Sequence, residues 1–333
     1  MVMRASAIKV GVVGAGYWGP NIIRNLAGRG VLDSVCDTDA AALAKVHAAH
    51  PNVATTADFG AMLARPIDAV VIAAPAQLHA PMAMRAIASG KHVLVEKPLA
   101  LSVSDGKQIA AASRAANVTV FVGHLLLYHA AVKKLRALIA EGVIGDVWHV
   151  RSRRLSLGKL RTHEDVWWSF APHDVALILA IMGEEPSGVL ASRTMGRNVE
   201  LSDLVYADYE FSHGRSAHVE VCWLDPEKSA RLDVFGTRGV LTLTDARQGS
   251  TLVVKPIELG KDARGAPVVT RGEEQRVKVD EEEPLAAELS AFIKSVETGV
   301  SAETDAEQGV AVLRMLSMAD DAAIRRLELR AFA

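Results

Sequence analysis

The spacing of hydrophobic positions changes about one third of the way along the chain. From residue 8 to about residue 122, short apolar runs alternate with segments whose apolar residues recur at helical spacing. This order is typical of a parallel sheet covered by helices. The pattern predicts strands at 9–13, 32–36, 69–74, 92–95 and 119–122, and helices at 17–28, 40–50, 57–63, 79–89 and 102–117.

Beyond residue 123 the pattern is mixed at first and then takes the period of two that marks half-buried strands. A helix is predicted at 130–141, a strand at 147–157, a polar loop at 158–169 and a short helix from Pro172 to Met182. Alternating segments at 204–211, 217–224, 231–235 and 240–244 predict hairpins of a largely antiparallel sheet. Helices at 284–298 and 305–327 end the pattern, and the charged stretch 261–283 is expected to be exposed.

The first apolar run leads directly into a glycine-rich turn, Gly14-Ala15-Gly16-Tyr17-Trp18-Gly19. Gly14 permits a tight turn, Gly16 leaves room for a pyrophosphate, and Gly19 allows close packing of helix on strand. The following helix offers free N–H groups and a positive dipole end to phosphates. The second strand ends at Asp37, which suits adenine ribose hydroxyls and would repel a 2'-phosphate. We therefore predict an NAD site, with NADP disfavoured and a purely structural turn as the competing interpretation.

These patterns predict an α/β protein of two domains. Residues 1–122 are expected to form a Rossmann dinucleotide-binding domain. Residues 123–333 are expected to form an α+β domain for substrate binding and oligomerisation, with a large open and mostly antiparallel sheet.

Ligands of such parallel sheets bind beyond the carboxyl ends of the strands. The candidate cofactor-binding residues are Gly14, Gly16, Tyr17, Trp18, Gly19, Asp37, Ala74, Pro75, His79, Glu96 and Lys97. For His79, which begins a predicted helix, a cofactor contact and an ordinary polar residue of a first turn are equally open.

Two residues could handle the proton of an alcohol oxidation. Lys97 stands at a strand end, where its ammonium could stabilise a developing alkoxide and Glu96 could orient it. His173 follows Pro172, a residue suited to the first helical position, so we expect its imidazole in a first turn whose dipole keeps it neutral. An ordinary histidine at a helix start is an equally open interpretation of His173.

Composition narrows the class of protein. The 333 residues include 37 basic and 39 acidic side chains, with no basic block, so nucleic-acid binding has no support. No apolar run approaches the ~20 residues of a membrane span, and Lys9 interrupts any signal-peptide core, so a cytoplasmic location is expected. Cys36 and Cys222 lie far apart, which favours buried thiols over a disulfide or a metal site.

The glycine turn, Asp37, Glu-Lys-Pro at 96–98 and Ala-Pro-His-Asp at 171–174 together resemble the Gfo/Idh/MocA family of NAD(P)-dependent oxidoreductases. The similarity covers nearly the whole chain. It implies a Rossmann domain followed by a domain with an open sheet, a catalytic Lys97, a cis Lys97–Pro98 bond, and His173 as acid/base. Within the family, the segments 122–135, 153–161 and 167–174 resemble bacterial UDP-N-acetylglucosaminuronate 3-dehydrogenases.

The subgroup resemblance suggests a substrate with a diphosphate and a carboxylate, which arginine can bind through paired hydrogen bonds. The candidate substrate-binding residues are Lys97, His124, Arg153, Arg161, His163 and His173. Each arginine taken singly could equally belong to a solvated charged face. A homo-oligomer is expected, because a one-layer sheet with apolar positions on both faces would leave one face uncovered in a monomer. Val219, Val221 and Trp223 supply one apolar face, and the resemblance implies a homodimer or homotetramer that covers the other.

One departure from the family leaves alternatives open. The family usually has aspartate four residues before the catalytic histidine, and Ser169 stands there in this chain. The alternatives within the family are a keto-sugar reductase and an inositol or free-sugar dehydrogenase. Outside sugar dehydrogenation, they are an NAD-dependent glycosidase and a non-catalytic NAD-binding regulator.

Overall fold

The computed structural model describes residues 8–158, 160–161, 164–196, 201–246 and 249–331. The contacts divide the chain into two units. The first contains the N-terminal residues up to Leu125 together with Glu283–Leu313, and the second contains Leu126–Glu282 with the residues from Arg314 onward. Residues 283–313, which the sequence analysis placed in the second domain, therefore group with the first unit.

A parallel sheet forms the centre of the first unit. Among the described residues its six strands follow the order β3-β2-β1-β4-β5-β6, the strand order of a Rossmann fold. The strands are β1 Val10–Val13, β2 Leu32–Cys36, β3 Ala54–Thr56, β4 Ala69–Ile72, β5 His92–Glu96 and β6 Val120–Gly123. The sequence analysis missed β3, because three residues of Ala-Thr-Thr at a sheet edge make no apolar run.

Three helices of the first unit begin where a side chain accepts one of their free N–H groups. Asp39, Asp58 and Ser102 each cap a helix in this way. The α-helices are α1 Gly19–Gly28, α2 Ala40–Ala49, α3 Phe59–Leu63, α4 His79–Ala88, α5 Val103–Ala116 and α8 Pro284–Thr298, with a 3-10 turn η1 Ala76–Leu78. The 3-10 turn η2 Leu125–Tyr128 lies at the boundary between the two units along the chain.

The late helix α8 belongs to the first unit because its apolar stripe packs on the parallel sheet. The ring of Phe292 meets the ring of Phe121 on β6 edge to face, at a centroid distance of 5.6 Å. After the helix, the N–H of Val122 donates to the carbonyl of Thr304 at 2.7 Å. The segment thus continues the core that the first 125 residues begin, although a long stretch of sequence separates the two.

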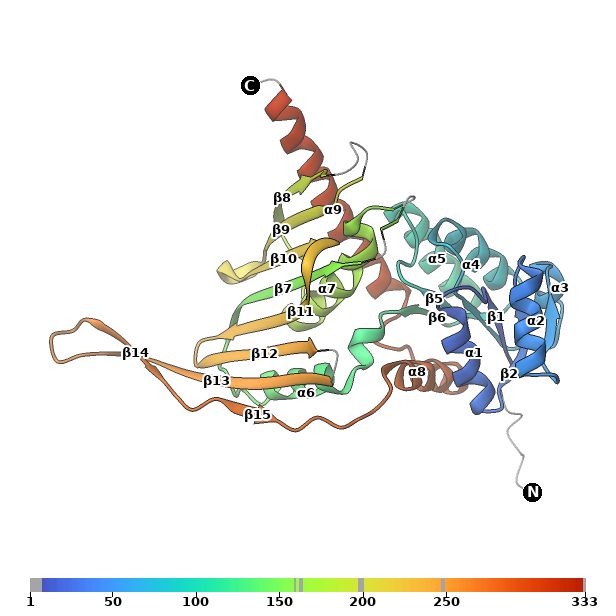
Figure 1. Cartoon of the computed structure of the whole chain (residues 1–333), viewed down its shortest axis with the longest axis horizontal. Coiled ribbons are helices and arrows are strands. Elements are labelled where there is room, and N and C mark those ends of the chain that lie inside the picture. The colour runs from blue at the N-terminus through green and yellow to red at the C-terminus, as the bar shows by residue number, and fades with distance from the viewer. Residues whose placement is uncertain (1–7, 159, 162–163, 197–200, 247–248, 332–333) are drawn as a thin grey trace. The chain divides into compact units, whose positions relative to one another are not determined.

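The second unit is built on one large sheet (Figure 1). Its described strands run in the order β14-β13-β12-β11-β7-β10-β9-β8, with β15 paired to β13, and all neighbours are antiparallel except β7 and β10. The strands are β7 Val147–Leu157, β8 Gly188–Thr194, β9 Leu204–Glu210, β10 Ser216–Cys222, β11 Leu224–Gly236, β12 Gly239–Ala246, β13 Gly249–Lys261, β14 Pro267–Arg271 and β15 Gln275–Val277.

Helices cover one face of this sheet. They include α6 Ala130–Ala140 and α7 Val166–Met182, while η3 Ser212–Gly214 joins β9 to β10 and α9 Ala306–Ala331 ends the chain. Val219, Val221 and Trp223 are fully buried on the side of the sheet that α7 contacts. The polar half of the same strands, by the alternation of a pleated strand, lies on the opposite face.

Two further expectations can be compared with the structure. Both Cys36 and Cys222 are free thiols, and burial raises the pKa of each. No helix in the described ranges combines the length and apolar character that crossing a bilayer demands.

Candidate functional site

The glycine turn after β1 closes so tightly that side chains are excluded at two of its three glycines. A Cβ on Gly14, whose φ is +96°, would lie 2.5 Å from the carbonyl oxygen of Ala73. A Cβ on Gly19 would lie 2.0 Å from the carbonyl oxygen of Gly14. Gly16 differs, because no atom lies within 4 Å of its Cβ position and the residue is exposed. The open space at Gly16 fits a pyrophosphate at the start of α1.

Asp37 is directed at this turn. Its carboxylate accepts the N–H of Ala15 at 2.6 Å and that of Asp39 at 2.8 Å. Each carboxylate oxygen keeps a further lone pair, which suits the two ribose hydroxyls of NAD. Tyr17 is 90 % exposed beside the turn, where its ring can lie against a bound cofactor.

His79 ties two strand ends together. Its buried ring lies with Nδ1 2.7 Å from the carbonyl oxygen of Pro98 and Nε2 2.8 Å from that of Ala74. The ring therefore shapes the backbone at Ala74 and Pro75 on one side and after Lys97 on the other. A direct contact of His79 with the cofactor stays a prediction.

Glu96 links the glycine turn to the end of β5. Its carboxylate accepts the indole N–H of Trp18 at 2.6 Å. Burial raises the pKa of Glu96, against the lowering effect of the Lys97 ammonium and of this indole bond. The next peptide bond, Lys97–Pro98, is cis, as the family resemblance implied. The arrangement brings Trp18, Glu96 and Lys97 to the carboxyl edge of the sheet, where a cofactor would bind.

His124 follows β6 at the same edge. It is 2 % exposed, and neither ring nitrogen has a hydrogen-bond partner among the described residues. Burial, with a smaller effect of the nearby Lys97 ammonium, lowers the pKa of His124 from 6.5 to about 3. A neutral imidazole that lacks a protein partner at this position can serve a bound ligand.

In the second unit, the surroundings of His173 differ from those expected. The helix α7 begins at Val166 because the side chain of Asp165 accepts the N–H of Trp168 at 3.1 Å and caps it. Pro172 thus lies inside the helix and His173 is its eighth residue, so the prediction of a first-turn histidine was wrong. The helix dipole, which acts within the first turn, does not reach this imidazole.

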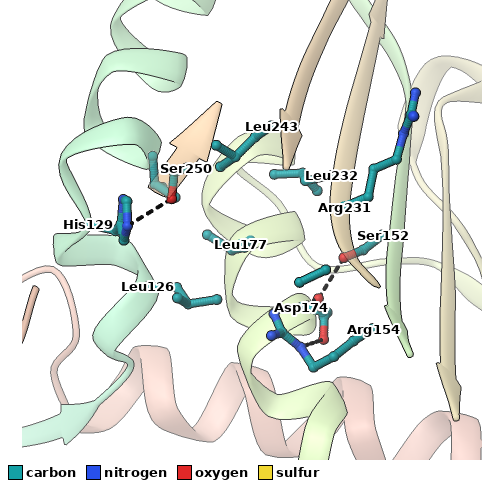
Figure 2. A pocket seen from close by; sticks show the side chains of 12 residues that line it. Leu126, His129, Ser152, Arg154, Asp174, Leu177, Arg231, Leu232, Leu243 and Ser250 are labelled. Carbon is teal, nitrogen blue, oxygen red and sulfur yellow. Dashed lines mark hydrogen bonds and ion pairs between the residues drawn. The ribbon is translucent and has the colours of Figure 1, made fainter. Parts of the chain in front are cut away.

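The residue after His173 is fixed by three hydrogen bonds. Asp174 is 1 % exposed and accepts from the hydroxyl of Ser152 at 2.6 Å. It also accepts two bonds from the guanidinium of Arg154, at 2.8 and 3.1 Å. Figure 2 shows this group in a pocket of the second unit, where His129 lies near Ser250 on the other side. The network locks α7 to β7 beside the proposed catalytic histidine.

The two candidate arginines, Arg153 and Arg161, lie in different parts of the second unit and pair with different acidic residues. Arg153 donates to Glu220 on β10 at 2.7 Å, on the face of the sheet away from α7, so the structure does not bring it together with His173. Arg161 is exposed and pairs with Glu164 at 2.9 Å. His163 lies outside the described residues. The sequence analysis missed Arg154, which the period of two along β7 could have assigned to the helix side once α7 was placed.

The open space at Gly16 makes a prediction that separates folding from binding. Gly16→Ala should unfold at the same denaturant concentration as the wild type, because its methyl group meets no protein atom. It should weaken NAD binding by about tenfold or more, or ~1.4 kcal/mol, because the methyl group occupies the pyrophosphate position. Titration calorimetry with NAD measures the loss. The matched control is Gly28→Ala in α1, also without neighbours within 4 Å, which should bind NAD normally.

The buried His124 predicts a pH dependence of stability. Between pH 6.5 and about pH 3 the unfolded chain binds a proton that the folded chain refuses, so stability falls as the pH falls. This group contributes a slope of up to ~1.4 kcal/mol per pH unit in that window. Denaturant unfolding at about pH 6 and about pH 5 should show a shallower loss in His124→Gln. The exposed control His213→Gln should follow the wild type, and equal slopes in all three proteins would contradict the assignment.

Comparison with known proteins agrees with this geometry. Residues 8–124 match the Gfo/Idh/MocA model described as an oxidoreductase family with an NAD-binding Rossmann fold, and residues 132–242 match the C-terminal domain of the same family. A solved structure from Magnetospirillum magnetotacticum MS-1, described as an oxidoreductase, is 32 % identical, with a TM-score of 0.81 and coverage of 94 % of this chain and 99 % of its own.

Two curated relatives have more specific names. The UDP-N-acetylglucosamine 3-dehydrogenase of Acidithiobacillus ferrooxidans is 25 % identical over 87 % of this chain and 88 % of its own, and its structure superimposes with a TM-score of 0.83. The 1,5-anhydro-D-fructose reductase of Ensifer adhaerens is 28 % identical over 72 % of this chain and 80 % of its own. The chain belongs to the Gfo/Idh/MocA family of NAD-binding oxidoreductases.

Proposed function

We propose that this protein oxidises the 3-hydroxyl group of a nucleotide-activated sugar with NAD, and that the sugar is a UDP-N-acetyl-hexosaminuronate. The observation that carries the proposal is the position of Lys97, at the carboxyl end of β5 and tied through Glu96 to the glycine turn. A relative that oxidises the 3-position of UDP-N-acetylglucosamine, similar over most of both chains, supports the substrate class.

Lys97 supplies the charge that the reaction needs. When a secondary alcohol is oxidised, its oxygen becomes more negative as the C–H bond breaks, and a nearby ammonium lowers that cost. Bound NAD accepts the hydride that the carbon loses. The Lys97 ammonium orients the hydroxyl, and the neutral imidazole of His124 can accept a hydrogen bond from the ligand without competing for the positive charge.

His173 takes the role of acid/base. Its side chain extends from α7, whose rotation is fixed one residue later by the bonds of Asp174 to Ser152 and Arg154. A general base must lie within hydrogen-bonding reach of the proton it removes. A helix whose rotation is fixed keeps the imidazole in one position better than a flexible loop would. Ser169, at the position where the family resemblance implies an aspartate, supplies a hydroxyl and no negative charge on the same helix.

A second candidate substrate is a nucleotide sugar that carries no carboxylate. Arg153, proposed from sequence for the uronate carboxylate, is held by Glu220 on the face away from α7, which removes one expected anion partner. Arg161 remains as the candidate cation on the segment before α7. The loss of Arg153 favours, as the alternative, a nucleotide sugar without a carboxylate, and the reductase relative adds keto-sugar reduction to the possibilities.

We also propose a cytoplasmic homodimer or homotetramer. The apolar positions from which an oligomer was expected, Val219, Val221 and Trp223, all lie on one face of the sheet, and α7 already covers that face. The other face carries charged pairs, Arg153 with Glu220 and Arg151 with Asp233. A second copy on this face would therefore meet a polar surface that carries these two ion pairs.

Lys97→Ala should lower kcat by at least about a hundredfold, the contribution of a well-placed proton-handling group. NAD affinity should change little, because the ammonium acts mainly in the transition state. Steady-state kinetics and NAD titration measure the two effects separately. Lys107→Ala, an exposed lysine on α5, is the matched control and should behave as the wild type; unchanged turnover in Lys97→Ala would remove this residue from the mechanism.

The substrate is tested by NADH absorbance with a panel of UDP-sugars, with and without a 2-oxo acid that reoxidises bound cofactor. NADH formed from the UDP-N-acetyl-hexosaminuronate but not from UDP-N-acetylglucosamine would support the proposal in full. NADH from UDP-N-acetylglucosamine would support the neutral alternative. Silence with every nucleotide sugar, despite tight NAD binding, would reject the nucleotide-sugar class.

A further inference from the structure

The helix α8 carries a buried acidic residue that no motif of the sequence analysis included. Glu288 is 1 % exposed, and its Oε1 has no hydrogen-bond partner in the described ranges. Burying an ionised carboxylate without a partner costs several kcal/mol, so such a group is neutral or paired. The residue therefore needs a neighbour or a proton.

Glu288 lies on the face of α8 that packs against β6, and the charge of Glu96 acts on it. Phe292, one turn further along α8, packs on Phe121 of β6. Gly123 lies two residues beyond Phe121, hence on the same face of β6, and its register partner on β5 is Glu96. The Oε2 of Glu96 lies only 3.0 Å from the position of a Gly123 Cβ, so the missing side chain leaves room there for carboxyl groups.

The surroundings of the two carboxyl groups decide which of them is ionised. Burial raises the pKa of both. For Glu96, the Lys97 ammonium and the N–H groups of Trp18 and Lys97 oppose the rise. For Glu288, the charge of Glu96 adds to it. These opposing effects favour the proton on Glu288 and the negative charge on Glu96.

We propose that Glu288 is a positioning residue of the dinucleotide site, whose neutral carboxyl group donates a hydrogen bond to the Glu96 carboxylate and holds it between the Trp18 indole and Lys97. The Glu96 carboxylate is then held from three elements: by Trp18 of the glycine turn, by Lys97 after β5 and by Glu288 of α8. This inference rests on the proposed role of Lys97 only for its effect on turnover, since the proposed hydrogen bond between Glu288 and Glu96 does not require substrate.

The protonation state is tested in the protein without cofactor or sugar. Infrared difference spectra at neutral pH compare the wild type with Glu288→Gln and with Glu297→Gln, a matched change at an exposed position of the same helix. The first difference should show the loss of a protonated carboxyl band, and the second the loss of carboxylate bands. If Glu288→Gln removes carboxylate bands instead, Glu288 is ionised and the proposal is wrong.

The positioning role is tested by two replacements at the same site. Glu288→Gln keeps a neutral donor of the same shape, so NAD affinity and kcat should stay close to those of the wild type. Glu288→Leu removes the donor and should weaken NAD binding by about tenfold or more, as expected for a lost hydrogen bond to a charged group. Equal NAD affinity in wild type and Glu288→Leu, or an equal loss in both variants, would overturn the proposal. If Glu288→Leu does not fold, the infrared result and Glu288→Gln decide.

Discussion

The closure of the glycine turn upon itself is the constraint on which the first unit depends. Gly14 approaches the backbone of Ala73 after β4, and Gly19 approaches Gly14, at distances that admit no side chain. These contacts hold the start of α1 close to the carboxyl edge of the sheet, and Gly16 lies in the turn between them with open space at its Cβ position. Since both contacts are made by backbone atoms, the shape of this turn does not depend on side-chain rotamers.

Polar groups at this edge are held by bonds between elements that are distant in sequence. Trp18 reaches Glu96 across 78 positions, and His79 spans the backbone carbonyls of Ala74 and Pro98. Each bond satisfies a group that burial would otherwise penalise. The energy of these hydrogen bonds therefore helps to fix Trp18, Glu96 and His79 at the edge where the cofactor site is expected.

The sequence predicted the parallel sheet of the first unit and the segments that follow its strands at the carboxyl edge, since buried runs and glycine spacing are local signals. It could not predict that 283–313 returns to this unit, because the contact of Phe292 with Phe121 is a matter of tertiary packing. It missed β3 because an edge strand needs no apolar run. It misplaced the start of α7 because Pro172 is a stronger local signal than the cap at Asp165, which the structure uses.

Neighbouring arginines on β7 show why residue type alone does not assign a site. Arg153 and Arg154 are chemically alike, yet the pleat sends one to Glu220 and the other to Asp174. The first bond joins two strands on the face away from α7, whereas the second secures the helix that carries His173. Because neighbouring residues of a strand point to opposite faces, Arg153 forms an ion pair on the outer face and Arg154 holds the helix α7 in place. The division becomes visible only when the helix that covers one face is known.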